Sequence, residues 1–214
     1  MANAVFFDFD GVIVDSANIK TAAFYELFLK FGEEKAKRVK EYHIKNQGVS
    51  RFEKFRSIFK NILRLQYSDL VEKKYSQAFS EIVLKKIVNA DFIPGVLFFL
   101  EELKKKNIKI FLLSATPEDE LKKICWEKDI DSYFYKIAGS PKSKVEHGKE
   151  IISDFNLAPK EIVFFGDSAS DLQASRELGT QFIGVTHQSK NVFLQDKIPI
   201  IVNFKGYDVE QFAK

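Results

Sequence analysis

The stretch Phe6-Phe7-Asp8-Phe9-Asp10-Gly11-Val12-Ile13-Val14-Asp15-Ser16 stands near the start of the 214-residue chain. Its apolar beginning, Val5 to Phe7, predicts a buried strand, because the run is short and consists of branched and aromatic residues. Two carboxylates, Asp8 and Asp10, follow with one residue between them, and the two-residue period of a strand turns both side chains to one side. Gly11 comes next, where the backbone must turn tightly or approach a ligand closely, so we expect it in the substrate site.

Two negative charges this close repel each other and require compensation. A divalent cation provides it most simply, since hard cations take oxygen ligands. Alternatively, one carboxyl stays protonated, as a general acid requires. Asp8 and Asp10 could also be turn residues after a surface strand, but the fully apolar strand before them and the later motifs favour a functional site.

The composition is that of an ordinary globular protein, with 45% hydrophobic and 29% charged residues in a chain long enough to bury a sizeable core. The net charge of +3 is too small to indicate a nucleic-acid partner. We find no apolar run that would span a bilayer and no basic leader, and therefore expect a cytoplasmic protein without membrane or nucleic-acid partners, as a monomer or small homo-oligomer. The single cysteine, Cys125, is expected to be a packed thiol rather than a nucleophile.

The chain changes character twice along its length. After the first strand, Ser16 is expected to cap a helix that extends to about Phe31. From residue 33 to about 89, apolar residues recur at helical spacing among Lys, Glu and Arg, with breaks near Gly48 and residues 67–69, which predicts three or four amphipathic helices. Further along, short apolar strands alternate with helices, as in βαβ units with a parallel sheet. We therefore predict an α/β fold with a Rossmann-like parallel-sheet core flanked by helices. Residues 1–15 and 91–214 would form the catalytic core domain, and 16–90 a helical cap domain inserted after the first strand.

Polar residues follow the predicted strands where parallel sheets bind ligands, at the carboxyl ends. After the strand 108–113, Ser114 precedes the amides of Ala115 and Thr116 close to a helix start. A hydroxyl and free amides at such a position form an anion site, which makes Ser114 and Ala115 candidate binding residues. An ordinary helix cap with Pro117 in the first turn would have the same sequence.

Further candidates lie near the later strands. Lys142 and Lys144 stand near the start of a helix predicted over residues 142–156, although lysines are common on surfaces. Asp167 leaves a buried strand, and Asp171 lies one helical turn on. Together with Asp8, these residues supply carboxylates for a metal, a cation and an anion cradle, which is what phosphoryl transfer through an aspartyl nucleophile needs.

At these residues the chain resembles the haloacid dehalogenase-like superfamily, in particular the phosphoglycolate phosphatase and beta-phosphoglucomutase group with a C1-type helical cap. Asp8-Phe9-Asp10-Gly11-Val12 is similar to the first motif and Ser114 to the second. A lysine at 142 or 144 corresponds to the third, and Gly166–Asp171 resembles the fourth.

The resemblance implies a mechanism. Asp8 would be the nucleophile that takes the phosphoryl group, and Asp10 would protonate the leaving group and then activate water. Mg²⁺ would be held by the Asp8 side chain, the Asp10 backbone carbonyl and Asp167, with Asp171 supporting the metal or the lysine. Ser114 and the lysine would hold the phosphoryl oxygens.

Two positions are left open by the motifs. Lys144 fits the spacing of one branch of the superfamily and Lys142 that of another, whose Lys-Pro motif is absent here because Ser143 follows. We prefer Lys144. Gly48-Val49-Ser50-Arg51 resembles the specificity loop of the mutases, and Arg51 is suited to bind a second phosphate or a carboxylate, although a solvated arginine fits equally well.

The expected activity is a Mg²⁺-dependent phosphatase acting on a small phosphorylated metabolite, such as a sugar or organic-acid phosphate. A phosphosugar mutase is the alternative, but Lys20 stands where those mutases have a histidine, which favours the phosphatase. Lys20 also leaves open phosphonate cleavage through a Schiff base, whereas Asp10 argues against dehalogenation. A non-catalytic binding protein with the same fold is a third possibility, which the intact motifs disfavour.

Overall fold

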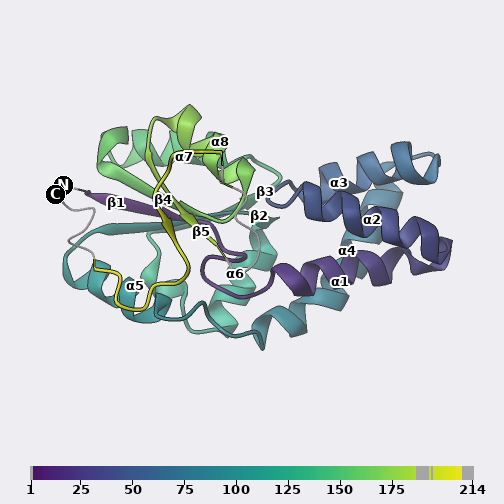
Figure 1. The fold of residues 1–214 in the computed structure, drawn as a ribbon, viewed down its shortest axis with the longest axis horizontal. Helices are drawn as coiled ribbons and strands as arrows, with labels where there is room; N and C mark the ends of the chain where they lie inside the picture. Colours follow the sequence, from purple (N-terminus) through teal and green to yellow (C-terminus); the bar gives the residue numbers. More distant parts are fainter. Residues whose placement is uncertain (1, 187–192, 194, 209–214) are drawn as a thin grey trace.

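The computed structural model describes residues 2–186, 193 and 195–208. A parallel sheet forms the centre of one part of the molecule (Figure 1). Its strands run in the order β3-β2-β1-β4-β5-β6 across the described residues. Their bounds are β1 Ala4–Phe7, β2 Lys109–Pro117, β3 Lys136–Ser140, β4 Ile162–Gly166, β5 Gln181–Val185 and β6 Ile200–Ile201. The predicted α/β class and parallel sheet are thus confirmed.

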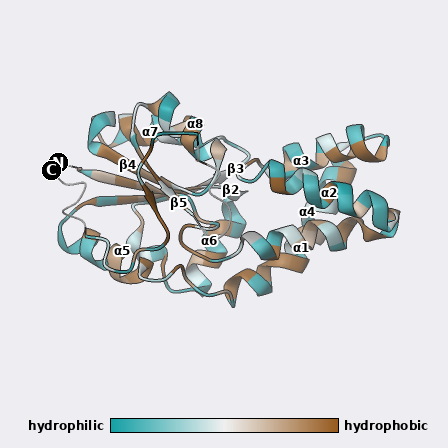
Figure 2. Cartoon of the chain, in the orientation of Figure 1, coloured by the Kyte–Doolittle hydropathy of each residue, from teal (hydrophilic) through white to brown (hydrophobic). Residues whose placement is uncertain are grey.

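The strand β1 lies at the centre of the sheet, paired in parallel with β2 on one side and β4 on the other. Val5 and Phe7 belong to the apolar cluster on one face, and Ala4 and Phe6 to the cluster on the opposite face. Because both faces are covered, the strand has no polar side to alternate with, which explains its uninterrupted apolar sequence. Figure 2 shows hydrophobic residues along the strands and hydrophilic residues on the outward sides of the helices.

Helices cover both faces of the sheet. Phe99 of α5 (Val96–Lys105) and Leu121 of α6 (Glu118–Glu127) belong to the same apolar cluster as Val5. Ile151 of α7 (Lys144–Asp154) and Leu172 of α8 (Ala169–Leu178) belong to the cluster of Phe6 on the other face. The sheet is therefore the middle layer of three, and loops at its carboxyl edge are free to form a site.

Four further helices come between β1 and α5 and lie beyond one end of the sheet (Figure 1). They are α1 (Ala17–Phe28), α2 (Glu33–Lys45), α3 (Arg51–Ser57) and α4 (Asp69–Val88). A 3₁₀ turn at Leu29–Phe31 follows α1, and a π-helix at Ile58–Leu63 continues α3. Aromatic rings hold them together: the ring centroids of Phe24 and Phe79 are 4.6 Å apart, and those of Phe28 and Tyr75 are 5.4 Å apart. All four helices fall within the range predicted for the cap, whereas residues 1, 187–192, 194 and 209–214 of the predicted core lie outside the described part. Within that part, no helix combines the length and the apolarity needed to cross a bilayer.

Two predicted boundaries are wrong. The strand expected to stop at Leu113 continues as β2 to Pro117, with a register shift after Leu113 and a pairing of Pro117 with Ser140. Pro117 is therefore not the first helical residue but the cap before α6. The helix expected from Lys142 begins at Lys144, because Ser143 forms a reciprocal capping pair with Glu146 that fixes the start of α7.

The fully buried Cys125 provides a test of the packing. Burial, with a smaller effect of Asp131, raises the pKa of the Cys125 thiol to about 12. At about pH 8, roughly one thiol in ten thousand would be ionised, and the thiolate is the reactive form. We expect the native protein to resist a disulfide-exchange reagent and to react fully once denatured in guanidinium chloride. Rapid stoichiometric labelling of the native protein would contradict this packing.

Candidate active site

The chain leaves β1 through a tight loop. The amides of Ile13 and Val14 donate to the carbonyl of Phe9 at 2.9 and 3.1 Å, and the Gly11 amide donates to Val14 at 2.8 Å. Gly11 has a φ of 80°, and a Cβ at this position would collide with the Asp167 carboxylate. The predicted tight turn at Gly11 is confirmed, and its lack of a side chain allows Asp167 to approach the first motif.

Asp8 and Asp10 line the same pocket, although the strand ends at Phe7 and Asp10 stands in the loop after it. Each carboxylate meets a lysine of its own: Asp8 contacts Lys144, and Asp10 contacts Lys20. The repulsion between the two aspartates is thus compensated by two separate cations.

Lys144 connects two buried carboxylates. Its Nζ donates to Asp8 Oδ1 at 2.7 Å and also to Asp171 Oδ1. Burial alone would lower the pKa of Lys144, but Asp171 and Asp8 raise it, so the ammonium form is firmly held. Burial raises the pKa of Asp8 to about 7; Lys144 opposes this shift, while Asp171 and Asp10 add to it. Lys142, in contrast, is exposed and pairs with Glu150 at 2.5 Å. The structure therefore brings Lys144, and not Lys142, to Asp8.

A group of carboxylates adjoins Asp8. One oxygen each of Asp8, Asp167 and Asp171 lies within 4.8 Å of the others. Burial raises the pKa of Asp167 well above its usual range, and the charges of Asp8 and Asp171 add to the shift. Asp171 also accepts a bond from the Ser168 amide at 3.1 Å, so both of its oxygens already have donors. Asp8 and Asp167 are consequently the carboxylates best placed to share a hard cation, with Asp171 supporting Lys144.

Asp10 is held by three donors. Ser16 Oγ donates to Oδ1 at 2.5 Å, Lys20 Nζ donates to Oδ2, and Thr116 Oγ1 lies 3.2 Å from Oδ2. Lys20 also donates to Thr116 at 2.8 Å. Burial alone would raise the pKa of Asp10, but the charge of Lys20 and the bonds from Lys20, Ser16 and Thr116 outweigh it and lower the pKa. Ser16, expected to cap the first helix, instead uses its side chain to hold Asp10.

The predicted anion cradle has a different form. Ser114 Oγ accepts the amide of Thr116 at 3.1 Å, so that amide is not free. Ser114 and Lys144 line a second cavity of about 300 Å³, which adjoins the pocket of Asp8 and Asp10 along Ala115, Gly48 and Val49. Ala115 thus lies at both cavities, while Ser114 and Asp8 face different ones.

Similarity to known proteins fits this arrangement. Residues 5–185 match the sequence family described as haloacid dehalogenase-like hydrolase. The chain belongs to this family. The resemblance inferred from the four motifs is therefore confirmed.

The relatives of this hydrolase include several phosphatases. A phosphorylated carbohydrates phosphatase of Thermotoga maritima is 27% identical over 86% of this chain and 85% of its own length. A phosphoglycolate phosphatase of Pseudomonas putida is 24% identical over 86% of this chain and 69% of its own. The crystal structure of a beta-phosphoglucomutase from Clostridium difficile matches with a TM-score of 0.80 and 23% identity, covering 100% of this chain and 96% of that one, and so shares the fold. The expected enzyme class, a phosphatase of this hydrolase family, is confirmed at that level.

Arg51, expected to bind substrate, is engaged within the protein. Its two terminal nitrogens donate to the two Glu120 oxygens at 2.9 and 2.6 Å, and Nη1 also donates to Ser80 at 2.7 Å. The guanidinium carbon lies 4.7 Å from the centre of the Phe79 ring. Arg51 also lines the pocket of Asp8, but its fork already holds a carboxylate. In this structure the ion pair joins α3 of the inserted helices to α6 beside the sheet.

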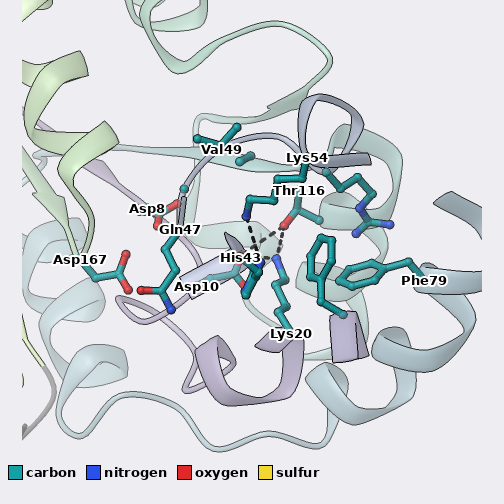
Figure 3. Close-up of a pocket in the computed structure, with 14 residues that line it drawn as sticks. Asp8, Asp10, Lys20, His43, Gln47, Val49, Lys54, Phe79, Thr116 and Asp167 are labelled. Atoms are coloured by element: carbon teal, nitrogen blue, oxygen red, sulfur yellow. Dashed lines mark hydrogen bonds and ion pairs between the residues drawn. The ribbon is translucent and has the colours of Figure 1, made fainter. Parts of the chain in front are cut away.

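The pocket contains residues that the sequence did not identify. Figure 3 shows Asp8, Asp10 and Asp167 facing side chains of the inserted helices across a cavity of about 60 Å³. The unanticipated lining residues are Phe24, His43, Gln47, Lys54 and Phe79. Polar and charged residues in a helical block are normally solvated and aromatic residues normally form its core, and only the fold brings these particular ones to the pocket.

The buried pair of Arg51 and Glu120 is testable by stability. Arg51→Met should destabilise the protein by about 3 kcal/mol, because it leaves a buried carboxylate without its partner. Adding Glu120→Gln should restore much of that loss. Urea unfolding of wild type, both single variants and the double variant gives the coupling energy, and additive effects would contradict the pairing.

The two candidate lysines form a matched pair. Lys144→Met should reduce phosphatase activity by at least about 1,000-fold, since it removes the cation bonded to Asp8. Lys142→Met removes the same charge from an exposed position and should retain activity within about twofold. Phosphate release by both variants, with circular dichroism to confirm folding, decides between them; the opposite ranking would favour Lys142.

Proposed function

We propose that this hydrolase is a Mg²⁺-dependent phosphatase that acts on a small phosphomonoester, such as a sugar or organic-acid phosphate, through a phosphoryl group carried on Asp8. The observation that supports this most strongly is the separate bonding of Asp8 and Asp10 in one pocket. Asp8 lies beside a buried cation and two further carboxylates, whereas Asp10 lies in a network of hydroxyl and ammonium donors. The two aspartates thus have environments suited to different tasks.

The residues present fit Mg²⁺. The donors are carboxylate oxygens, which Mg²⁺ prefers, and Asp8 and Asp167 are the side chains that would hold it. Burial, together with the neighbouring carboxylates, raises the pKa of both groups, and a bound cation would stabilise their ionised forms. When bound, Mg²⁺ neutralises charge on the transferring phosphoryl group.

The chemistry of this chain's own residues proceeds in two steps. An oxygen of Asp8 attacks phosphorus, the ester P–O bond breaks, and the departing alcohol oxygen takes a proton from Asp10. Water then attacks the phosphoryl group, its proton passes to Asp10, and inorganic phosphate leaves Asp8. Asp10 must be protonated before the first step, and Lys20 and Thr116, both bonded to its Oδ2, are placed to relay a proton.

The helices between residues 16 and 90 act in this proposal as a cap domain over the core formed by residues 1–15 and 91–214. Closure would exclude water and hold the leaving group. Gly48 supports this role: a Cβ there would collide with the hydroxyls of Ser168 and Ser170 at the start of α8, so the loop before α3 rests directly on the core. Schiff-base chemistry at Lys20 finds no support, since an amine in an ion pair with Asp10 is a poor nucleophile.

A substrate panel tests the proposal. We expect phosphate release from at least one small phosphomonoester with Mg²⁺ present, a loss of at least about 1,000-fold in Asp8→Asn, and near-wild-type rates in the control Asp154→Asn on the exposed side of α7. Chelation of the metal should abolish release, and adding Mg²⁺ should restore it.

A folded wild-type protein that releases phosphate from none of the panel would overturn the phosphatase. If the same protein isomerises a sugar monophosphate when primed with a bisphosphate, the mutase alternative replaces it. Release that survives Asp8→Asn would leave a phosphatase with a different nucleophile.

A further inference from the structure

One buried cation in the pocket differs from the others. Lys54 of α3 is 4% exposed and lines the pocket. The other two cations that line it, Lys20 and Arg51, each bond to a carboxylate. Among the described residues, no acidic side chain forms an ion pair with Lys54; its Nζ lies 3.2 Å from Nδ1 of His43. The chain thus places one ammonium in the pocket without a counter-charge.

His43 fixes the direction of this amine but supplies no negative charge. Its ring stacks on Phe24 at a centroid distance of 4.4 Å. Burial lowers the pKa of His43 to about 2, and the charges of Lys54 and Lys20 add to this effect, so the ring is neutral. Nδ1 is then an acceptor for the Lys54 amine, with the proton of the ring on the other nitrogen.

The surroundings of Lys54 favour an incoming anion. The pKa of Lys54 is lowered to about 7, chiefly by burial; the charges of Lys20 and Arg51 act in the same direction, and Asp10 and Asp167 only partly oppose them. A buried charge without a partner is costly, and a negatively charged group brought next to it removes that cost. Asp10 cannot take this place in the described arrangement, because Lys20, Ser16 and Thr116 already occupy its oxygens.

We propose that Lys54 binds a second anionic group of the substrate, a carboxylate or a second phosphate on the part that leaves as the alcohol. This inference rests on the proposed phosphatase function and names its substrate class. In Figure 3 the Lys54 amine reaches into the pocket beside His43 and Thr116, with Asp8 and Asp167 on the other side. The phosphoryl group at Asp8 and the second anion at Lys54 would therefore occupy different parts of the pocket. The cavity of about 60 Å³ favours a substrate with few atoms between them.

Matched substrates test this assignment. 2-Phosphoglycolate carries a carboxylate, ethylene glycol bisphosphate a second phosphate, and 2-hydroxyethyl phosphate neither, on the same two-carbon skeleton. Wild type should prefer at least one of the first two by tenfold or more in kcat/KM, and which of them it prefers identifies the anion. Lys54→Met should lose about tenfold to 100-fold on that substrate and stay within about twofold on 2-hydroxyethyl phosphate.

Lys60→Met is the control, because it removes an equal charge from an exposed position six residues along the same helical segment. Methionine keeps the length of the lysine stem, and circular dichroism checks the fold; Lys54→Gln serves as a second variant if Lys54→Met does not fold. No preference in wild type, or an equal loss on all three substrates in the Lys54 variant, would overturn the assignment.

A binding measurement separates this inference from the catalytic proposal. Calorimetry should give tighter binding by wild type of phosphonoacetate or ethane-1,2-diphosphonate than of ethylphosphonate, and Lys54→Met should abolish that difference. None of these phosphonates needs turnover to be bound. If the protein releases no phosphate but still binds the phosphonates with a second anionic group more tightly, and this preference requires Lys54, the proposed phosphatase activity is overturned and the anion site at Lys54 is retained. Equal binding of all three by wild type would overturn the site even if phosphate is released.

Discussion

The geometry of the active site depends on how two neighbouring carboxylates are kept in one pocket. Asp8 and Asp10 are one residue apart and would repel each other in a shared environment. The structure separates them by giving each its own lysine, Lys144 from the first turn of α7 and Lys20 from α1. One lysine belongs to the helices around the sheet and the other to the inserted helices. The charge balance of the site is therefore complete only when the two parts of the chain meet.

The contacts around the pocket follow from that requirement. Arg51 bonds Glu120 across the same boundary, and Gly48 lets the loop before α3 rest on Ser168 and Ser170. The ion pair of Arg51 and Glu120 is buried and directional, and the close approach at Gly48 leaves no room for a side chain, so together they favour one relative position of the two parts. In the proposed phosphatase, separation of the two parts would also break a bond of Asp10, because Lys20 belongs to the inserted helices.

The sequence predicted the elements whose residues have one physical solution. The short apolar run before Asp8 favours a strand covered on both faces, and Gly11 favours a tight turn, which the structure forms with a positive φ. The preference for Lys144 over Lys142 agrees with a geometry in which Ser143 and Glu146 start the helix at Lys144. The form of the segment around Ser114 was not predictable, because pairing with β3 carries the strand on to Pro117, and such long-range pairing leaves no local signal.

The same reasoning explains why the inward-facing cations were missed. A lysine in an amphipathic helix is normally solvated, and Lys54 has the same local sequence character as exposed Lys60 on the next turns. What distinguishes it is a partner eleven residues earlier, His43, and a ring, Phe24, from a third helix. Burial of a lysine amine depends on the packing of three helices at once, so it cannot be predicted from the hydrophobic periodicity of one helix. Since an uncompensated charge weakens folding, its place in the pocket is better explained by a ligand than by stability.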